Sequence, residues 1–319
     1  MVSLASIKSS NVNAATTLPT RPVALFVGGT SGIGEGMARA LARHTNGNAD
    51  IIIVGRNKDA AQGILSSLPL PEPGTSSTPS PTPVTREFIQ CDVTRMKNVH
   101  TATQHILSKY SKLNYLIIST GILTLAGREE TEEGIDKKLA VHYYARWKFI
   151  RDLLPLLDKA KVEDGTGSVM SVLVAGRGGE INADDLGLKK TFSLKNAAVA
   201  APTYNDLMME SFSEKHPSLS LIHSHPGFIR TPIAANSPSL LIQGFGLLMS
   251  TLLRPFTSSV EDCAEYMWHG MHSTMKEAGA WRIDASGDDL GKMSYHGDEN
   301  QREKLWEHTE AEVEAALKK

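Results

Sequence analysis

The feature that most constrains this chain is a glycine-rich segment at residues 23–34, which reads VALFVGGTSGIG. A short apolar run is followed by Gly28, Gly32 and Gly34, and then by a helical pattern with one apolar face. Glycines at these places allow a tight bend after a strand, close approach of the backbone to a pyrophosphate, and close packing of the helix on the strand. The N–H groups that begin the helix would face the phosphates. The segment therefore predicts a dinucleotide-binding turn rather than an ordinary strand-to-helix connection.

Length and composition indicate a globular protein and argue against several other classes. The 319 residues suffice for one large or two small domains, and the 41% apolar content supports a sizeable core. The net charge of −2 gives no electrostatic reason to expect a nucleic-acid partner. No run approaches the ~20 apolar residues that span a bilayer, so we expect no stable membrane insertion. Two cysteines, Cys91 and Cys263, are too few for a disulfide framework and favour a cytoplasmic protein.

Apolar runs and helical patterns alternate along the chain, which predicts an α/β fold: a doubly wound, Rossmann-type parallel sheet in three layers. We expect an N-terminal arm at 1–20, with a transit peptide as the weaker alternative, one domain at 21–290, and a charged helical tail at 291–319. The Pro/Ser/Thr-rich stretch 69–83 predicts a surface loop. The expected strands are 23–27, 51–54, 87–90, 115–118, 168–172, 219–223 and 280–283, and the later helices are 58–68, 97–110, 132–157 with a break near Pro155, 195–215 and 261–271.

The end of the second expected strand bears on the choice of nucleotide. Arg56 and Asn57 follow this strand, and no acidic residue stands beside them. An acid at this place binds the ribose hydroxyls of NAD, whereas an arginine accommodates the 2′-phosphate of NADP through its bidentate geometry. The sequence thus favours NADP(H), with a solvated surface arginine as the alternative. We predict no metal site.

Two motifs, G-x-x-x-G-x-G at 28–34 and HPGFIRT at 225–231, resemble those of the short-chain dehydrogenase/reductase family, and the layout is similar to reductases of fungal secondary metabolism. The resemblance covers roughly residues 23–284. It implies that Asp92 and Val93 contact the adenine, although an N-cap role suits Asp92 equally well. It also implies that the strand end at 118–121 and the turn after Pro226 contact the cofactor. The expected cofactor-binding residues are Gly28, Thr30, Ser31, Gly32, Ile33, Gly34, Arg56, Asn57, Asp92, Val93, Thr120, Gly121, Pro226, Gly227, Ile229 and Thr231.

The catalytic residues of that family are missing from their usual places. The family uses a tyrosine as general acid/base, a lysine four residues later that lowers its pKa, a serine and an asparagine. Here Leu173 or Val174 stands at the serine place, and His142 stands at the asparagine place. The tyrosine and lysine places are apolar or polar-neutral, and no Tyr-x-x-x-Lys occurs in the region. The candidates for substitutes are His142, Ser171, Lys195 and Tyr204, each with a structural alternative: a packed histidine, a strand serine, a solvated lysine and a core tyrosine.

Residues 233–257 form an apolar insertion directly after Thr231. The resemblance implies a lid over the substrate, and its composition favours a lipophilic small molecule. A homo-oligomer interface and a membrane-surface helix are the alternatives.

Three functions remain open. The first is NADP(H)-dependent reduction of a carbonyl, or the reverse oxidation, which leads by analogy of fold alone. The second is a non-redox isomerase, cyclase or lyase on the same fold, and the third is a nucleotide-binding protein without catalysis.

Overall fold

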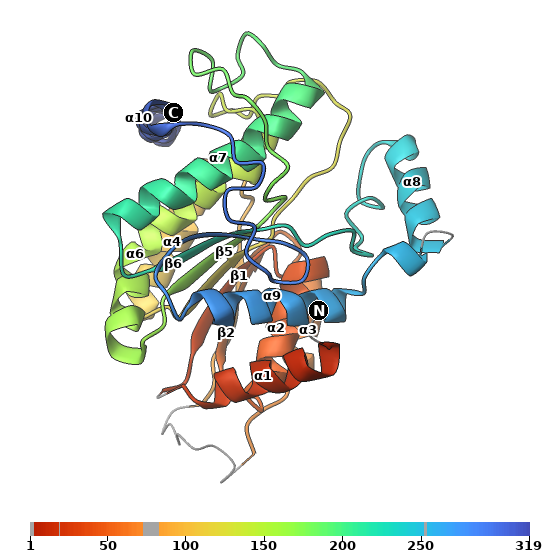
Figure 1. The fold of residues 1–319 in the computed structure, drawn as a ribbon, viewed down its shortest axis with the longest axis vertical. Helices are drawn as coiled ribbons and strands as arrows, with labels where there is room; N and C mark the ends of the chain where they lie inside the picture. Colours follow the sequence, from red (N-terminus) through yellow and green to blue (C-terminus); the bar gives the residue numbers. More distant parts are fainter. Residues whose placement is uncertain (1–2, 19, 73–82, 252–253) are drawn as a thin grey trace.

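The structure is a computed structural model that describes residues 3–18, 20–72, 83–251 and 254–319. Its centre is a seven-stranded sheet, all parallel, in the order β3-β2-β1-β4-β5-β6-β7 (Figure 1). The chain winds from β1 toward β3 on one side and from β4 toward β7 on the other, so the direction of winding switches between β1 and β4. The strands are β1 (Val23–Val27), β2 (Asp50–Gly55), β3 (Arg86–Gln90), β4 (Tyr115–Ile118), β5 (Ser168–Val172), β6 (Ser220–Ser224) and β7 (Gly279–Ile283).

Helices cover both faces of the sheet, which explains why its central strands are apolar without alternation. One apolar core lies between the sheet and α4, α6, α7 and α10, and the other lies between the sheet and α2, α3 and α9 (Figure 1). This arrangement confirms the predicted three-layer, doubly wound fold. The helices with at least ten residues are α1 (Leu4–Thr16), α2 (Gly32–His44), α3 (Lys58–Ser67), α4 (Met96–Lys109), α6 (Ala145–Asp164), α7 (Leu194–Lys215), α8 (Leu240–Thr251), α9 (Val260–Thr274) and α10 (Glu299–Lys318).

The long helical region expected at 132–157 differs from its prediction at both ends. It starts with a short helix, α5 (Lys137–Leu139), passes through a π-helical turn, η1 (Ala140–Tyr144), and continues as α6 to Asp164. Pro155 lies inside α6 and causes no break. Proline has no N–H, so Pro155 cannot donate a hydrogen bond to the Arg151 carbonyl one turn earlier. Both residues are exposed, so this carbonyl lies on the solvent side of the helix.

The N-terminal residues are not the surface arm that was expected. Residues 4–16 form α1, which places Ile7, Asn11 and Ala15 on one buried face at a spacing of four residues. The Asn11 side chain donates hydrogen bonds of 2.9 Å to the backbone carbonyl and to the carboxylate of Glu265 in α9. The small polar residues of α1 allow this close contact, and their low apolar content concealed the helix in the sequence.

The C-terminal helix is a structural part of the domain. α10 begins with a capping box between Asp298 and Gln301, and buries Leu305, Val313 and Ala316 against the core. The charged residues noted in the sequence lie on its other faces. The loop predicted at 69–83 falls mostly outside the described residues.

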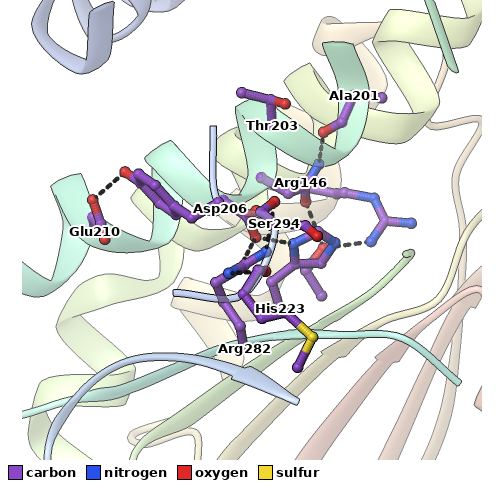
Figure 2. A network of polar contacts seen from close by, with 12 residues as sticks. Arg146, Ala201, Thr203, Asp206, Glu210, His223, Arg282 and Ser294 are labelled. Carbon is purple, nitrogen blue, oxygen red and sulfur yellow. Dashed lines mark hydrogen bonds and ion pairs between the residues drawn. The ribbon is translucent and has the colours of Figure 1, made fainter. Parts of the chain in front are cut away.

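A buried polar network ties α7 to β6 and β7. Asp206 of α7 lies between His223 and Arg282, with its Oδ1 atom 2.6 Å from His223 Nδ1 and 3.1 Å from Arg282 Nε (Figure 2). The Arg282 guanidinium also donates to the backbone carbonyls of Gly291, Met293 and Ser294. This network fixes the segment between β7 and α10.

Candidate active site

A cavity of about 500 Å³ opens at the carboxyl edge of the sheet, where the winding switches between β1 and β4. Such switch points are the usual ligand sites of open parallel sheets. The ends of four strands and the start of the apolar insertion build its wall. The lining includes most of the expected cofactor-binding residues, namely Gly28, Thr30, Ser31, Gly32, Ile33, Arg56, Asp92, Val93, Thr120, Gly121 and Thr231.

The glycine turn has the geometry that its sequence predicts. Gly28 and Gly32 adopt left-handed φ angles of +91° and +61°, which side chains rarely allow. Gly34 does not line the cavity. A Cβ atom on Gly34 would lie 2.7 Å from the Gly28 carbonyl oxygen and 2.4 Å from Ser119 Oγ, so this glycine permits α2 to pack against the turn and the end of β4.

The end of β2 presents Arg56 at the cavity. Its side chain is exposed and has no hydrogen-bond or ion-pair partner among the residues described by the structure. Asn57, expected beside it as a cofactor contact, lies outside the cavity lining. Its Oδ1 atom accepts a 3.0 Å hydrogen bond from the Ala60 N–H and thereby caps α3. The Asn57 side chain, expected to bind the cofactor, is therefore engaged in helix capping.

The end of β3 supplies Asp92 and Val93 to the wall. Asp92 Oδ1 accepts hydrogen bonds from the backbone and the hydroxyl of Thr94, at 3.0 and 2.9 Å, which fixes the turn into α4. Cys91 also lines the cavity, and burial raises the pKa of its thiol to about 12. This thiol is therefore neutral at physiological pH and is a poor nucleophile.

The HPGFIRT turn is only partly at the cavity. Thr231 lines it, whereas Pro226, Gly227 and Ile229 do not. Gly227 has a φ of +81°, and a Cβ atom there would lie 3.1 Å from the Ala285 side chain. Ile229 pairs with Ser258 in an isolated β-bridge. The turn is thus held against the segments before α9 and after β7.

His142 lies in η1, behind the cavity wall. Its Nε2 atom accepts a 3.1 Å hydrogen bond from the backbone N–H of Ile122, a lining residue. Burial, with the nearby charges of Arg146 and Lys138, lowers the pKa of the imidazole to about 3. His142 is therefore neutral at physiological pH and serves as an acceptor that holds the loop after β4.

Ser171 and Tyr204 lie in the core and not at the cavity. Ser171 Oγ donates to Asn205 Oδ1 at 2.7 Å and accepts from Arg146 Nη1 at 2.5 Å. The Tyr204 hydroxyl donates to the Leu186 carbonyl at 2.9 Å, and burial raises its pKa. Both are fully buried. These are corrections to the expected catalytic candidates, because neither group reaches the lining.

Lys195 is exposed in the first turn of α7, after the N-cap Ser193, and is not part of the lining. The structure therefore does not bring the four catalytic candidates together.

Several lining residues were missed by the sequence reasoning. Lys137 and Glu129 form an ion pair of 3.5 Å on the wall, and Lys137 precedes Val141 by one helical turn on the same face. Their signal is weak because Glu129 lies in an irregular segment. The other missed residues are Gly55, Cys91, Thr94, Ile122, Leu123, Thr124, Val141 and Pro232. Ser119 lies in the strand end at 118–121, and Ile233, Asn236 and Pro238 lie in the insertion, both of which the sequence had assigned to the site.

The apolar insertion contributes to the site at its beginning only. Ile233, Asn236 and Pro238 line the cavity, and α8 then projects from the body of the molecule (Figure 1). The inner face of α8 packs through Gly246 on Ala234, while its outer face exposes large apolar residues: Leu240, Leu241, Phe245, Leu247 and Leu248. In the described parts of the chain, every helix is too short or too polar to cross a bilayer. Residues 252–253 of the expected lid lie outside the description.

Comparison with known proteins identifies the family. A family model described as short chain dehydrogenase matches residues 22–179. Oxidoreductase AN1596 of Emericella nidulans is 38% identical over 271 residues, which span 84% of this chain and 77% of that protein.

Solved structures share the fold at low sequence identity. A 3-ketoacyl-(acyl-carrier-protein) reductase from Brucella melitensis, complexed with NADH, has a TM-score of 0.57 at 18% identity and covers 86% of this chain and 99% of its own. A short chain dehydrogenase from Shigella flexneri, complexed with NADP, has a TM-score of 0.55 at 18% identity and covers 85% and 99%. Because the sheet, the glycine turn and the fungal relative agree, this chain belongs to the short-chain dehydrogenase/reductase family and is an oxidoreductase.

Proposed function

We propose that the protein is an NADP(H)-dependent oxidoreductase that reduces a carbonyl group, or oxidises the corresponding alcohol, of a lipophilic secondary metabolite. The observation that carries this proposal is Arg56, which stands at the cavity beyond the glycine turn and has no partner among the described residues. A dinucleotide whose pyrophosphate lies at the start of α2 would extend its adenosine toward the ends of β2 and β3.

The preference for NADP(H) rests on the charge at the end of β2. The 2′-phosphate of NADP carries negative charge and suits the fork of an arginine. Structures of this fold contain either nucleotide, as the NADH and NADP complexes above illustrate, so the fold alone does not decide the preference. No acidic residue follows β2 directly to bind the ribose hydroxyls of NAD, and Asp92 at β3 is engaged with Thr94.

The proposed substrate class follows from the remaining wall. Ile122, Leu123 and Val141 bring apolar side chains to the cavity, and the insertion adds Ile233 and Pro238. Glu129, Lys137 and Asn236 add polar groups to the same wall. Apolar side chains at a binding site favour ligands of the same character, and the polar groups would orient them. We assign the insertion at 233–257 as a lid over this pocket. Its glycines and prolines interrupt the apolar segment and would allow it to bend and close.

In the reaction itself, the nicotinamide of a bound reduced nucleotide would supply a hydride to the carbonyl carbon, and the carbonyl oxygen would take up a proton from solvent; oxidation of the alcohol would be the reverse. The protein's own part would be to hold the nucleotide at the glycine turn, to exclude water with the apolar wall, and to orient the substrate. Because Ser171 and Tyr204 are engaged in the core, we assign them structural roles and exclude them from proton transfer in this proposal. His142, with its low pKa, holds the Ile122 backbone.

We further propose that the protein acts in the cytoplasm with both cysteines reduced. Cys91 and Cys263 are buried free thiols. We also propose that the protein can form a homo-oligomer, because the exposed apolar face of α8 would suit a contact with a second copy of the chain.

The test is a titration of NADPH and NADH into the wild-type protein and into Arg56→Ala, followed by calorimetry or by NADPH fluorescence. We expect NADPH to bind at least about tenfold more tightly than NADH in the wild type. Arg56→Ala should remove this preference and leave NADH binding unchanged. Lys58→Ala is the matched control, because Lys58 is an exposed cation two residues away and outside the lining.

Equal affinity for the two nucleotides in the wild type would contradict the NADP(H) proposal. Tight NADPH binding without oxidation of the nucleotide by any member of a panel of lipophilic ketones and aldehydes would instead favour a non-redox enzyme on this fold.

A further inference from the structure

Arg146 is a fully buried arginine behind the cavity wall, and nothing in the family motifs assigned it a role. Its Nη1 atom donates to the Ile118 carbonyl at 3.1 Å and to Ser171 Oγ at 2.5 Å, and its Nη2 atom donates to the Thr120 carbonyl at 2.6 Å. Its Nε atom donates more weakly to the Val141 carbonyl, at 3.4 Å. The side chain lies within the buried polar network below α7 (Figure 2).

Among the residues that the structure describes, none supplies a direct counter-charge to Arg146. All four acceptors are neutral oxygens, and no carboxylate within the described residues forms an ion pair with this guanidinium. The nearby buried arginine, Arg282, differs in this respect because it pairs with Asp206. Burial lowers the pKa of Arg146 to about 9, so it remains protonated at neutral pH. A buried cation without a counter-charge is costly, and a role in shaping the site would offset that cost.

The contacts of Arg146 reach the cavity wall from behind. Thr120 and Val141, whose carbonyls accept its hydrogen bonds, both line the cavity. The Thr120 carbonyl belongs to the segment that leaves β4, and Val141 belongs to η1. Arg146 therefore fixes the distance between these two parts of the wall. The π-helical turn just before Arg146 is a local irregularity of the kind often found at functional sites.

A second set of hydrogen bonds joins the elements that carry the catalytic tyrosine, lysine, serine and asparagine in ordinary family members. Ser171 of β5 links Arg146 to Asn205 of α7, and the Asn205 amide donates to the His142 carbonyl at 2.8 Å. His142 in turn accepts from the Ile122 N–H. Arg146, Ser171 and Asn205 thus hold together the strand at the serine place, the helix at the tyrosine and lysine places, and His142 at the asparagine place.

Arg56 and Arg146 lie on opposite sides of β1. Arg56 follows β2, which pairs with one edge of β1, whereas Arg146 contacts β4 and β5, on the other side. A dinucleotide that crosses the glycine turn would extend its adenosine half toward Arg56 and its nicotinamide half toward the wall that Arg146 supports.

We propose that Arg146 is a positioning residue for the nicotinamide half of the nucleotide, acting through the Thr120 and Val141 carbonyls. This inference rests on the proposed function. The planar fork binds several carbonyl groups at once, which a lysine cannot reproduce. Replacing Arg146 would let the wall after β4 shift, while Arg56 at the end of β2 would stay unchanged.

The test compares two probes, NADPH and 2′,5′-ADP, on the wild type, Arg146→Met and Arg146→Lys. The second probe carries the adenosine and the 2′-phosphate but no nicotinamide. For Arg146→Met we expect NADPH to bind at least about tenfold more weakly and 2′,5′-ADP to bind within about twofold of the wild type. Arg151→Met is the matched control, because Arg151 is an exposed cation of α6 that pairs with Glu310. It should change neither affinity.

The ratio of the two affinities separates positioning from a general structural role. Equal weakening of both probes by Arg146→Met, or no weakening of NADPH, would overturn the inference. Full rescue of NADPH binding by Arg146→Lys would also overturn it, because the charge alone would then suffice. Failure of the wild type to bind either probe would instead refute the proposed nucleotide site.

Where Arg146→Met does not fold, as judged by circular dichroism and thermal melting, Ser171→Ala provides the same test. It removes one partner of the fork and the link to Asn205. It should weaken NADPH by about three- to fivefold and leave 2′,5′-ADP unchanged. An unchanged ratio of the two affinities would overturn the inference.

Discussion

Gly34→Ala is a minimal perturbation of the glycine turn, because it adds one methyl group. The structure places that Cβ atom 2.7 Å from the Gly28 carbonyl oxygen and 2.4 Å from Ser119 Oγ. The serine side chain can rotate away, but the Gly28 oxygen belongs to the backbone. To restore an ordinary contact, α2 and the turn must separate by roughly 0.7 Å, which exceeds what a well-packed interior absorbs without cost.

We expect this separation to affect both stability and nucleotide binding. Overpacking of this kind costs about 1–3 kcal/mol of unfolding free energy. For a chain of this length, that cost corresponds to a melting temperature lower by roughly 2–5 °C. The moved helix would no longer present its first N–H groups to the pyrophosphate, so NADPH affinity should fall by more than about tenfold.

The assay is thermal melting by circular dichroism together with NADPH titration. Gly63→Ala serves as the control, because a Cβ atom at this exposed position of α3 would meet nothing within 4 Å. This control should stabilise the protein by about 0.5–1 kcal/mol and leave nucleotide binding unchanged. Wild-type melting and wild-type NADPH affinity in Gly34→Ala would refute the argument that close packing at this glycine shapes the phosphate site.

Three further predictions concern the core and the packing of the termini. Tyr204→Phe should lower the unfolding free energy by about 1 kcal/mol and reduce turnover by less than about tenfold. Loss of a general acid/base group costs ~10²–10⁴ in rate, so a loss of that size in Tyr204→Phe would restore Tyr204 as a catalytic residue. Leu305→Ala, at a buried position of α10, should cost about 2–5 kcal/mol in chemical denaturation, and a surface-like cost below about 0.5 kcal/mol would show that α10 is dispensable. Burial raises the pKa of Glu265, but hydrogen bonds from His44 and Asn11 outweigh it and hold the pKa at about 2, below its ordinary 4.5. Because the Glu265 pKa is depressed in the folded state, its contribution to stability is present above pH 4.5 and is lost as the pH falls toward 2. Glu265→Gln should flatten the profile of unfolding free energy against pH between these values. An unchanged profile would contradict the role given to Glu265.

Local patterns were sufficient to predict much of the fold. The apolar runs of β4 and β5 match their predicted bounds, and the glycine turn predicted both the local geometry and the place of the cavity. These features depend on residues close together in the chain. Their periodicity and glycine content carry the information directly.

Features that depend on distant residues could not be predicted in the same way. The first helix is stabilised by the contact of Asn11 with Glu265, which lies 254 residues later. Asn57 and Asp92 belong to residue types that suit both caps and ligands, so only the structure shows what they bind. The sequence showed that the family's catalytic tyrosine, lysine, serine and asparagine are absent from their usual places. It did not show that Arg146 joins these places, because its partners come from three separate segments: the end of β4, η1 and β5.

We propose above all that this cavity binds NADP(H), with the 2′-phosphate of the adenosine at Arg56 and the nicotinamide on the other side of the glycine turn. The most direct measurement is a crystal structure of the protein with NADP⁺. We predict that the 2′-phosphate lies at hydrogen-bond distance from the Arg56 guanidinium, about 2.7–2.9 Å, and that the nicotinamide lies between Thr231 and the wall formed by Thr120 and Val141. A nucleotide bound with its 2′-phosphate away from Arg56, or with its nicotinamide outside this cavity, would contradict the account.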